Sequence, residues 1–161
     1  MSKPVSIDDL AALLPPKARL IGLDVGTKTI GLALSDIEHR LASPLVTIKR
    51  TKFAIDADAL IAEIVKFDVF ALVVGNPIAL DGADTPRAQA ARAFARNFSA
   101  RRDLPTLFWD ERFSTAAVER DLIANDVSRA KRAEVIDKMA AAYILQGALD
   151  ALARIAAQRE A

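Results

Sequence analysis

Three acidic side chains stand at the ends of two predicted strands, where they could bind a cation or act on a substrate. Asp24 lies at the end of the apolar run Leu20–Val25, and Asp110 and Glu111 immediately follow the run Thr106–Trp109. Because sites in open sheets form at the carboxyl ends of strands, these acids meet at one edge if the two strands are parallel neighbours. Adjacent residues at a strand end point to opposite faces, so only one of the last two acids faces the same way as Asp24.

A further acid, Asp137, begins a line of small and apolar residues on the last predicted helix. Ala141, Ile144 and Ala148 follow it at spacings of four, three and four, which places the set on one helix face. An acid in such a line points toward the protein, and the alanines allow the helix to approach a sheet closely. The alternative interpretation is an acid in the first helical turn, favoured there by the helix dipole.

The other acids also have ordinary structural interpretations. Asp24 could be a turn residue that accepts hydrogen bonds from the backbone of Gly26 and Thr27, and Asp110 with Glu111 could be a solvated cluster. Taken together, however, acids on separate elements suit hard cations that prefer oxygen ligands, such as Mg²⁺ or Mn²⁺. Two such ions can activate a water and stabilise the leaving oxygen of a phosphodiester. The acids therefore indicate phosphate chemistry.

Composition narrows the chemistry further. The 161-residue chain has no cysteine and one histidine, His39, which excludes disulfides, thiol nucleophiles, cysteine-built zinc sites and multi-histidine metal sites. With 22 basic and 21 acidic residues the formal net charge is +1, so any contact with nucleic acid must come from a local patch. At 52% hydrophobic and 27% charged residues, the composition is that of one globular domain.

The beginning of the chain does not resemble a secretion signal, because Asp8 and Asp9 stand where such signals are basic and the apolar run that follows is short. No stretch approaches the roughly 18 consecutive apolar residues that span a bilayer. We therefore expect a cytoplasmic protein without a membrane partner.

The apolar pattern predicts three strands and then alternating helices and strands. The runs 20–25 and 30–36 flank a tight turn, and 44–49 adds a third strand, so the short connections favour an antiparallel meander. The other expected elements are a helix over 56–67, a strand over 70–75, a helix from Thr85–Pro86 to about 99, a strand over 106–109, a helix from Ser114 or Thr115 to about 125, and a helix from about 131 to 153. This order predicts a mixed sheet covered by helices, with residues 1–18 as an extension or short helix outside the core.

Basic residues close to the acids are candidates for binding a backbone phosphate. Lys28 lies in the glycine-containing turn after Asp24, where backbone N–H groups and threonine hydroxyls are also available. Another cluster precedes Asp137 on the last helix. The nucleic-acid-binding candidates are Lys28, Arg112, Arg129, Lys131 and Arg132.

Other residues with binding potential have simpler interpretations. Arg92 and Arg96 share one helix face, and many such surface charges serve solvation alone. We expect Trp109 to pack in the core and His39 to lie in a loop, in preference to a base-stacking or catalytic role.

Four motifs, in order, resemble the YqgF (RuvX) family, the pre-16S rRNA nucleases that are also described as Holliday-junction resolvases. The motifs are LDVGTKTIGLALSD (23–36), VVGNPIALDG (73–82), WDERFST (109–115) and IDKMAAAYILQGALD (136–150). Together they cover roughly residues 20 to 150. Each motif alone is modest, but their common order makes the resemblance specific.

The resemblance implies a ribonuclease-H-like α/β fold, a mixed five-stranded sheet whose first three strands are antiparallel. It implies a nuclease domain over 20–153, with an extension over 1–19 and a tail over 154–161. Its catalytic and metal-binding carboxylates match Asp24, Glu111 and Asp137, with Asp110 as a further ligand or orienting residue. The implied reaction is hydrolysis of a phosphodiester with Mg²⁺ or Mn²⁺, as two ions, leaving a 5′-phosphate and a 3′-hydroxyl.

Two substrates and two other functions stay open at this point. The family points to the 5′ end of pre-16S rRNA in a ribosomal small-subunit precursor, and its older description points to four-way DNA junctions. The D-x-G-T sequence also resembles the phosphate loop of actin-like ATPases, which need two lobes, whereas this chain supplies one. A non-catalytic nucleic-acid-binding module is the remaining alternative, although three acids close to phosphate would weaken its binding unless a cation intervened.

Overall fold

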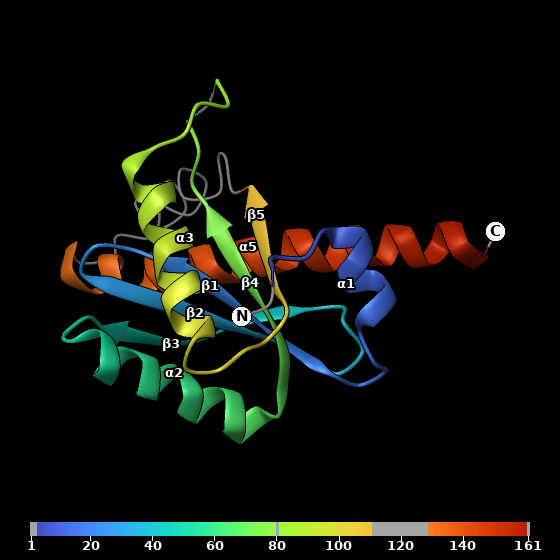
Figure 1. Cartoon of the computed structure of the whole chain (residues 1–161), viewed down its shortest axis with the longest axis horizontal. Helices are drawn as coiled ribbons and strands as arrows, with labels where there is room; N and C mark the ends of the chain where they lie inside the picture. Colours follow the sequence, from blue (N-terminus) through green and yellow to red (C-terminus); the bar gives the residue numbers. More distant parts are fainter. Residues whose placement is uncertain (1–2, 80, 111–128, 161) are drawn as a thin grey trace.

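The protein is built around one mixed sheet of five strands (Figure 1). The computed structural model describes residues 3–79, 81–110 and 129–160, and it describes 129–135 by their backbone alone. Across the sheet the strand order is β3-β2-β1-β4-β5. The strands are β1 (Arg19–Val25), β2 (Thr29–Ser35), β3 (Ala42–Lys49), β4 (Val69–Asn76) and β5 (Thr106–Asp110).

The pairing directions confirm the predicted meander. β1 pairs antiparallel with β2, and β2 with β3, because the connections between them are too short for a crossover. β1 pairs parallel with β4, and β4 with β5. Helix α2 connects β3 to β4, and α3 connects β4 to β5. The carboxyl ends of β1, β4 and β5 therefore lie at the same edge of the sheet.

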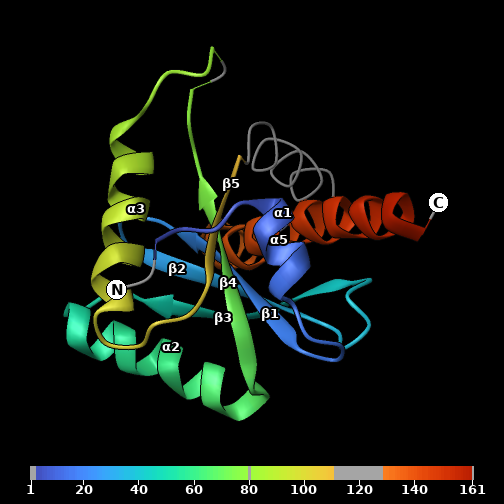
Figure 2. The same ribbon diagram turned by 45° about the vertical axis from the view of Figure 1, so that its right-hand side comes forward.

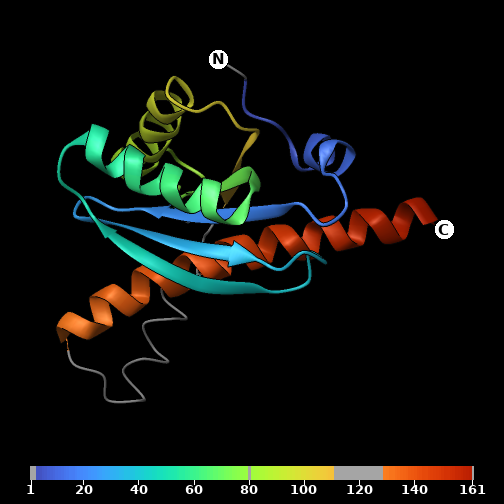
Figure 3. The same ribbon diagram turned by 90° about the horizontal axis from the view of Figure 1, so that it is seen from below.

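Helices cover both faces of the sheet (Figure 3). α2 (Phe53–Phe67) and α3 (Pro86–Ser99) pack on one face, and α5 (Arg129–Glu160) packs on the other. The threonine before α3, Thr85, accepts a hydrogen bond from the backbone N–H of Ala88 at 3.0 Å, as its position before a proline predicted. This cap fixes where α3 begins, beside the edge at which β1 ends.

Glycines allow α5 to lie unusually close to the sheet. A Cβ carbon added at Gly22 of β1 would lie 2.7 Å from the Cβ of Leu145, and one added at Gly31 of β2 would overlap the backbone carbonyl of Asp137. Between these contacts Ile144 and Leu145 are fully buried, and each such side chain contributes roughly 1.5–3 kcal/mol to folding. The close approach therefore fixes α5, and with it Asp137, against β1 and β2, the strands joined by the first turn of the meander.

Over Ile136–Glu160, α5 is long and apolar enough to cross a membrane. This was not predicted from the sequence, because no uninterrupted apolar run in it approaches that length. The many alanines of the helix account for its apolar character. Its apolar side chains, among them Ala141, Ala148 and Leu149, are buried against the sheet. Within this structure α5 is a core helix.

The N-terminal segment corrects one expectation, because it belongs to the core. Ser6 and Asp9 form a reciprocal capping box that starts α1 (Ile7–Leu13), and Leu10 is fully buried in the cluster beneath α5. Figures 1 and 2 both show α1 beside α5. The backbone N–H of Val5 donates to the Thr106 carbonyl at the free edge of β5. Val5, Ile7 and Leu14 pack against the same cluster. The sequence pattern of one short helix does not show which surface it packs against, so this packing was not predicted.

The helix that contains Asp137 also differs from expectation at both ends. It begins at Arg129 and ends at Glu160, so residues 154–160 continue the helix beyond the predicted end at 153. Because Asp137 lies two turns into α5, it is not an acid of the first turn. The helix predicted from Ser114 or Thr115 to about 125 lies outside the described residues.

Candidate active site

The central acid of the site is Asp24, whose side chain is buried at the end of β1. It is 3% exposed and stands in register with Gly31 of β2. The Nη2 of Arg87, in the first turn of α3, lies 3.0 Å from its Oδ1. An unpaired carboxylate here would be strongly destabilising, and the guanidinium offsets part of that penalty. The contact with Arg87 thus favours a charged site over a turn residue bonded to Gly26, whose backbone N–H donates to the Thr29 carbonyl instead.

Asp137 reaches the same edge from the opposite layer. Its carboxyl Oδ2 accepts a hydrogen bond from the Thr29 hydroxyl at the start of β2, and its backbone carbonyl lies against Gly31. Since Gly31 is the strand partner of Asp24, the two acids are held in neighbouring positions by β2. A sheet strand and a core helix therefore bring together carboxylates that the sequence separates widely.

The electrostatics of this pair are those of a cation site. Burial raises the pKa of Asp24 to about 6, Arg87 opposes the rise, and the nearby charge of Asp137 adds to it. A cation beside the buried carboxylate of Asp24 and the half-buried one of Asp137 would offset their mutual repulsion. Elevated acid pKa values of this kind are typical of functional sites.

The third expected carboxylate, Glu111, lies outside the described residues, as does Arg112. Within the described part of the chain, no cluster of three acidic, histidine or cysteine side chains gathers that could hold a metal ion. The pair Asp24 and Asp137 thus represents the part of the predicted set that the structure brings together.

Asp110 lies on the other face of the sheet from Asp24. Its neighbour Trp109 packs against Gly147 of α5, so alternation turns Asp110 toward the α3 face. Asp24 shares the α5 face with Gly22, which lies against Leu145. β1 and β5 are also separated by β4, a distance of about 10 Å at the usual strand spacing. The structure therefore does not bring Asp110 together with Asp24.

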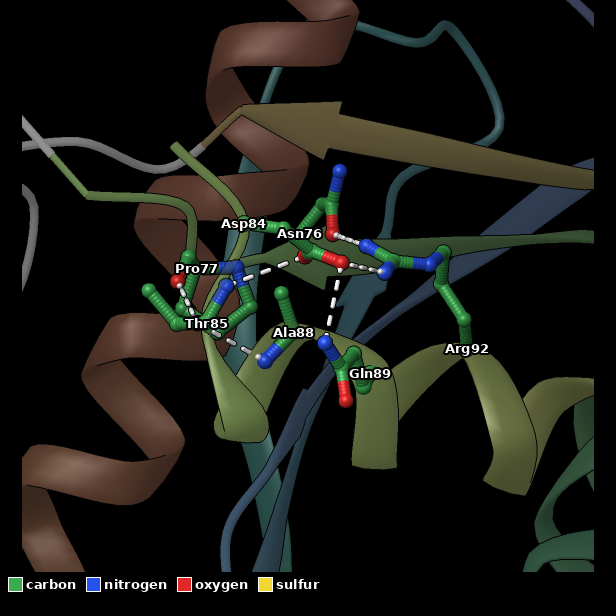
Figure 4. Close-up of polar contacts among 7 residues, drawn as sticks. All are labelled: Asn76, Pro77, Asp84, Thr85, Ala88, Gln89 and Arg92. Atoms are coloured by element: carbon green, nitrogen blue, oxygen red, sulfur yellow. Dashed lines mark hydrogen bonds and ion pairs between the residues drawn. The ribbon is translucent and has the colours of Figure 1, made fainter. Parts of the chain in front are cut away.

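Arg92 organises the loop that joins β4 to α3 (Figure 4). Its Nη1 donates to Asn76 Oδ1 at 2.8 Å, and its Nη2 lies 2.7 Å from Asp84 Oδ2. The hydroxyl of Thr85 donates to the Pro77 carbonyl at 2.6 Å. These contacts tie both ends of the loop to α3 and so hold Arg87 opposite Asp24.

Sequence reasoning did not single out Arg87. The available signal was its place directly after Thr85–Pro86, which begins a helix at the carboxyl end of the sheet. A local pattern predicts that position but does not show which acid the side chain meets. That partner is decided by how α3 packs across β4 and β1.

The basic candidates are only partly described. Lys28 is exposed in the turn after β1, at the edge where Asp24 lies. Arg50, at the end of β3, donates from Nη1 to the Gly26 carbonyl at 2.7 Å and so braces that turn. Arg129, Lys131 and Arg132 are helical residues at the start of α5, between five and eight residues before Asp137.

The two residues expected to be structural are confirmed as such. Trp109 packs its indole against Gly147, where an added Cβ would lie 2.7 Å from Nε1. His39 lies in the loop between β2 and β3 with a positive φ of 61°, and its Nε2 contacts the Ala18 carbonyl. That loop is at the opposite end of β2 from the turn beside Asp24.

The strand order, with three antiparallel strands followed by two parallel ones and helices on both faces, is that of the ribonuclease-H-like fold. Among solved structures, RuvC from Thermus thermophilus matches with a TM-score of 0.52 and 15% identity, covering 86% of this chain and 96% of that one. This likeness shows the shared fold.

The sequence places the chain more closely. The family model described as "RuvX: Holliday junction resolvase" matches residues 18–151. A "Putative pre-16S rRNA nuclease" from Methylocella silvestris is 60% identical over 153 residues, covering 95% of each chain. A relative of the same name from Sphingopyxis alaskensis is 61% identical over 146 residues, covering 91% of this chain and 95% of that one. The chain belongs to the RuvX family.

Proposed function

We propose that this protein is an endonuclease that hydrolyses phosphodiester bonds with divalent cations and processes the 5′ end of pre-16S rRNA. The observation that carries the proposal is the pair of acids Asp24 and Asp137, held together at the carboxyl end of β1 by contacts with β2. The choice of RNA is supported by the name that the relatives carry. The expected setting is the cytoplasm, with a ribosomal small-subunit precursor presenting the RNA.

The donor chemistry of the site fits Mg²⁺ or Mn²⁺. Asp24 and Asp137 offer hard carboxylate oxygens, and the raised pKa of Asp24 reflects a buried negative charge that a cation would stabilise. We assign Glu111 as the third ligand from its sequence motif. Two bound ions would supply the charge that activates a water and stabilises the leaving oxygen.

The protein side chains around this pair orient and neutralise it. Thr29 fixes Oδ2 of Asp137, and Arg87 fixes Oδ1 of Asp24. Among the described residues the second oxygen of each acid is left for a cation. Lys28, exposed on the adjoining turn, is placed to contact a substrate phosphate. We assign Arg112, Arg129, Lys131 and Arg132 to the same task from their positions in the sequence.

A four-way DNA junction is the second candidate substrate. It is favoured by the description of the matching family model. The same carboxylates would serve either substrate, because hydrolysis of a phosphodiester needs the same charges in RNA and DNA. Substrate choice therefore has to be measured.

The deciding experiment compares cleavage of a pre-16S rRNA 5′ leader and a four-way junction by the wild type and by Asp24→Asn, in Mg²⁺, Mn²⁺ or EDTA. We expect metal-dependent cleavage of the RNA that is lost in the variant, while RNA binding and folding persist. Asp8→Asn, at an exposed position of α1, is the matched control and should cleave normally. Selective cleavage of the junction would favour the second substrate, and cleavage retained by Asp24→Asn would refute the site.

The same preparation separates the two remaining functions. Nucleic-acid binding that is undiminished in EDTA, together with no cleavage in any divalent ion, would indicate a binding module. ATP binding or hydrolysis would indicate an actin-like lobe.

A further inference from the structure

A pocket of about 390 Å³ lies between α3, β5 and the N-terminal segment, apart from the two acids. Ala95, Leu104 and Phe108 supply its apolar surface, and Ser99 and Thr106 add hydroxyl groups. The N-terminal wall is held in place by the bond from Val5 N–H to the Thr106 carbonyl. The pocket is thus formed by three segments that are far apart in the sequence.

The charged residues that line this pocket are all basic. Lys3, Arg92 and Arg96 line it, and its described lining contains no acidic residue. Arg92 is already balanced by Asp84 and Asn76. Arg96, one turn further along α3, is exposed, and within the described residues its guanidinium makes no hydrogen bond or ion pair. The pocket therefore offers an apolar surface with positive charge at its rim that the described residues do not compensate.

The pocket is also connected to the site edge through α3. Arg87 contacts Asp24, and Arg96 lies nine residues later, about 14 Å further along the helix axis. Between these two residues, Arg92 donates a hydrogen bond to Asn76 at the carboxyl end of β4. Arg92 also lines the pocket. Arg92 and Arg96 lie on the same side of α3, whereas Arg87 lies on the opposite side. A short single strand that passes the carboxyl end of β4 beside Asn76 could therefore reach the pocket along Arg92 and Arg96.

We propose that this pocket binds one nucleotide of the single-stranded RNA substrate, several positions away from the cleaved bond. The base packs on the surface that includes Leu104 and Phe108, and the phosphate lies beside Arg96 and Lys3. Apolar or aromatic surface combined with a positive rim is the usual basis of single-strand binding. The inference rests on the proposed function for the identity of its occupant, but its test does not require cleavage.

The first experiment uses adenosine 5′-monophosphate in EDTA, followed by amide chemical shifts in solution. We expect the largest shifts at Ser99, Thr106 and Phe108, and weaker binding of adenosine or inorganic phosphate, since each supplies half of the interaction. Shifts confined to other regions, or equal binding of phosphate alone, would overturn the proposal.

The second experiment measures binding of a ten-nucleotide single-stranded RNA at several salt concentrations, also in EDTA. Arg96→Gln should weaken binding about threefold to tenfold at low salt and reduce the salt slope by about 0.7, as for one lost phosphate contact. Arg96→Lys should restore most of both. Arg154→Gln, an equal charge change at an exposed position of α5, should have neither effect.

Equal losses in Arg96→Gln and Arg154→Gln would show a general charge effect and would refute the pocket. Because neither measurement depends on metal ions or turnover, failure here is distinct from failure of the proposed nuclease activity.

Discussion

Arg87 holds the buried carboxylate of Asp24 at 3.0 Å, although the two residues lie 63 positions apart in the sequence. The contact joins the first turn of α3 to the end of β1. It places a positive charge beside one of two neighbouring acids, the other being Asp137 on α5. The site therefore contains its own partial counter-charge, and this has measurable consequences for the titration and stability of the protein.

Stability of the metal-free protein should fall as the pH rises from about 4 to about 6. Burial raises the pKa of Asp24 from 3.8 to about 6, so the folded protein holds a proton that the unfolded chain has already released. The stabilising contribution is complete below about pH 4 and is lost above about 6, a difference of about 3 kcal/mol. Urea unfolding in EDTA from pH 4 to 7 measures it.

Asp24→Asn should lack this contribution, because an amide does not titrate in this range. The comparison is needed because other acids act in the opposite direction. The backbone N–H of Leu41 lowers the pKa of Asp36, and a hydrogen bond from Arg92 lowers that of Asp84. Their effects are common to both proteins, so identical pH profiles for wild type and variant would contradict the assignment.

Arg87→Gln should raise the pKa of Asp24 above about 6, because the guanidinium charge opposes the effect of burial. Arg87→Lys should produce a smaller rise, since it keeps the charge but loses the planar donor. Titration of the Asp24 carboxyl carbon by NMR measures both values. In Asp137→Asn the pKa should instead fall, and no change in any of the three would show that these charges do not act on Asp24.

Gly31→Ala should displace Asp137 and abolish cleavage. The added methyl group would overlap the Asp137 carbonyl, so α5 must shift away from β2. Overpacking of this kind typically destabilises by about 1–3 kcal/mol, which urea unfolding would detect. Indole fluorescence gives a second measure, because Trp109 packs on Gly147 of the same helix. Full activity in a protein of unchanged stability would contradict the close approach.

Arg92→Gln should loosen the loop between β4 and α3, because it removes the contacts to both Asn76 and Asp84. Faster amide exchange at residues 78, 79 and 81–84 is the expected result. Gln89→Ala is the matched control, since it removes only a 3.2 Å hydrogen bond to Asp84. Equal exchange rates in the two variants would show that Arg92 does not organise the loop.

The sequence determined much of this protein by local rules. Three apolar runs separated by short connections specified the antiparallel start of the sheet. Thr85 before Pro86 specified where α3 begins. The ends of strands marked Asp24 and Asp110, and the spacing from Asp137 to Ala148 marked the face of α5 that meets the sheet. These features depend on neighbours within a few residues, which is why they could be predicted.

Only the tertiary structure decided which of these groups meet. It paired Asp24 with Arg87, set Asp137 against Gly31, turned Asp110 to the other face and buried Leu10 under α5. Each relationship joins segments that are distant in the chain, and no local preference encodes it. Packing decides these relationships, because helices fit closely on a twisted sheet in only a few arrangements. The arrangement adopted determines which residue contacts each buried charge.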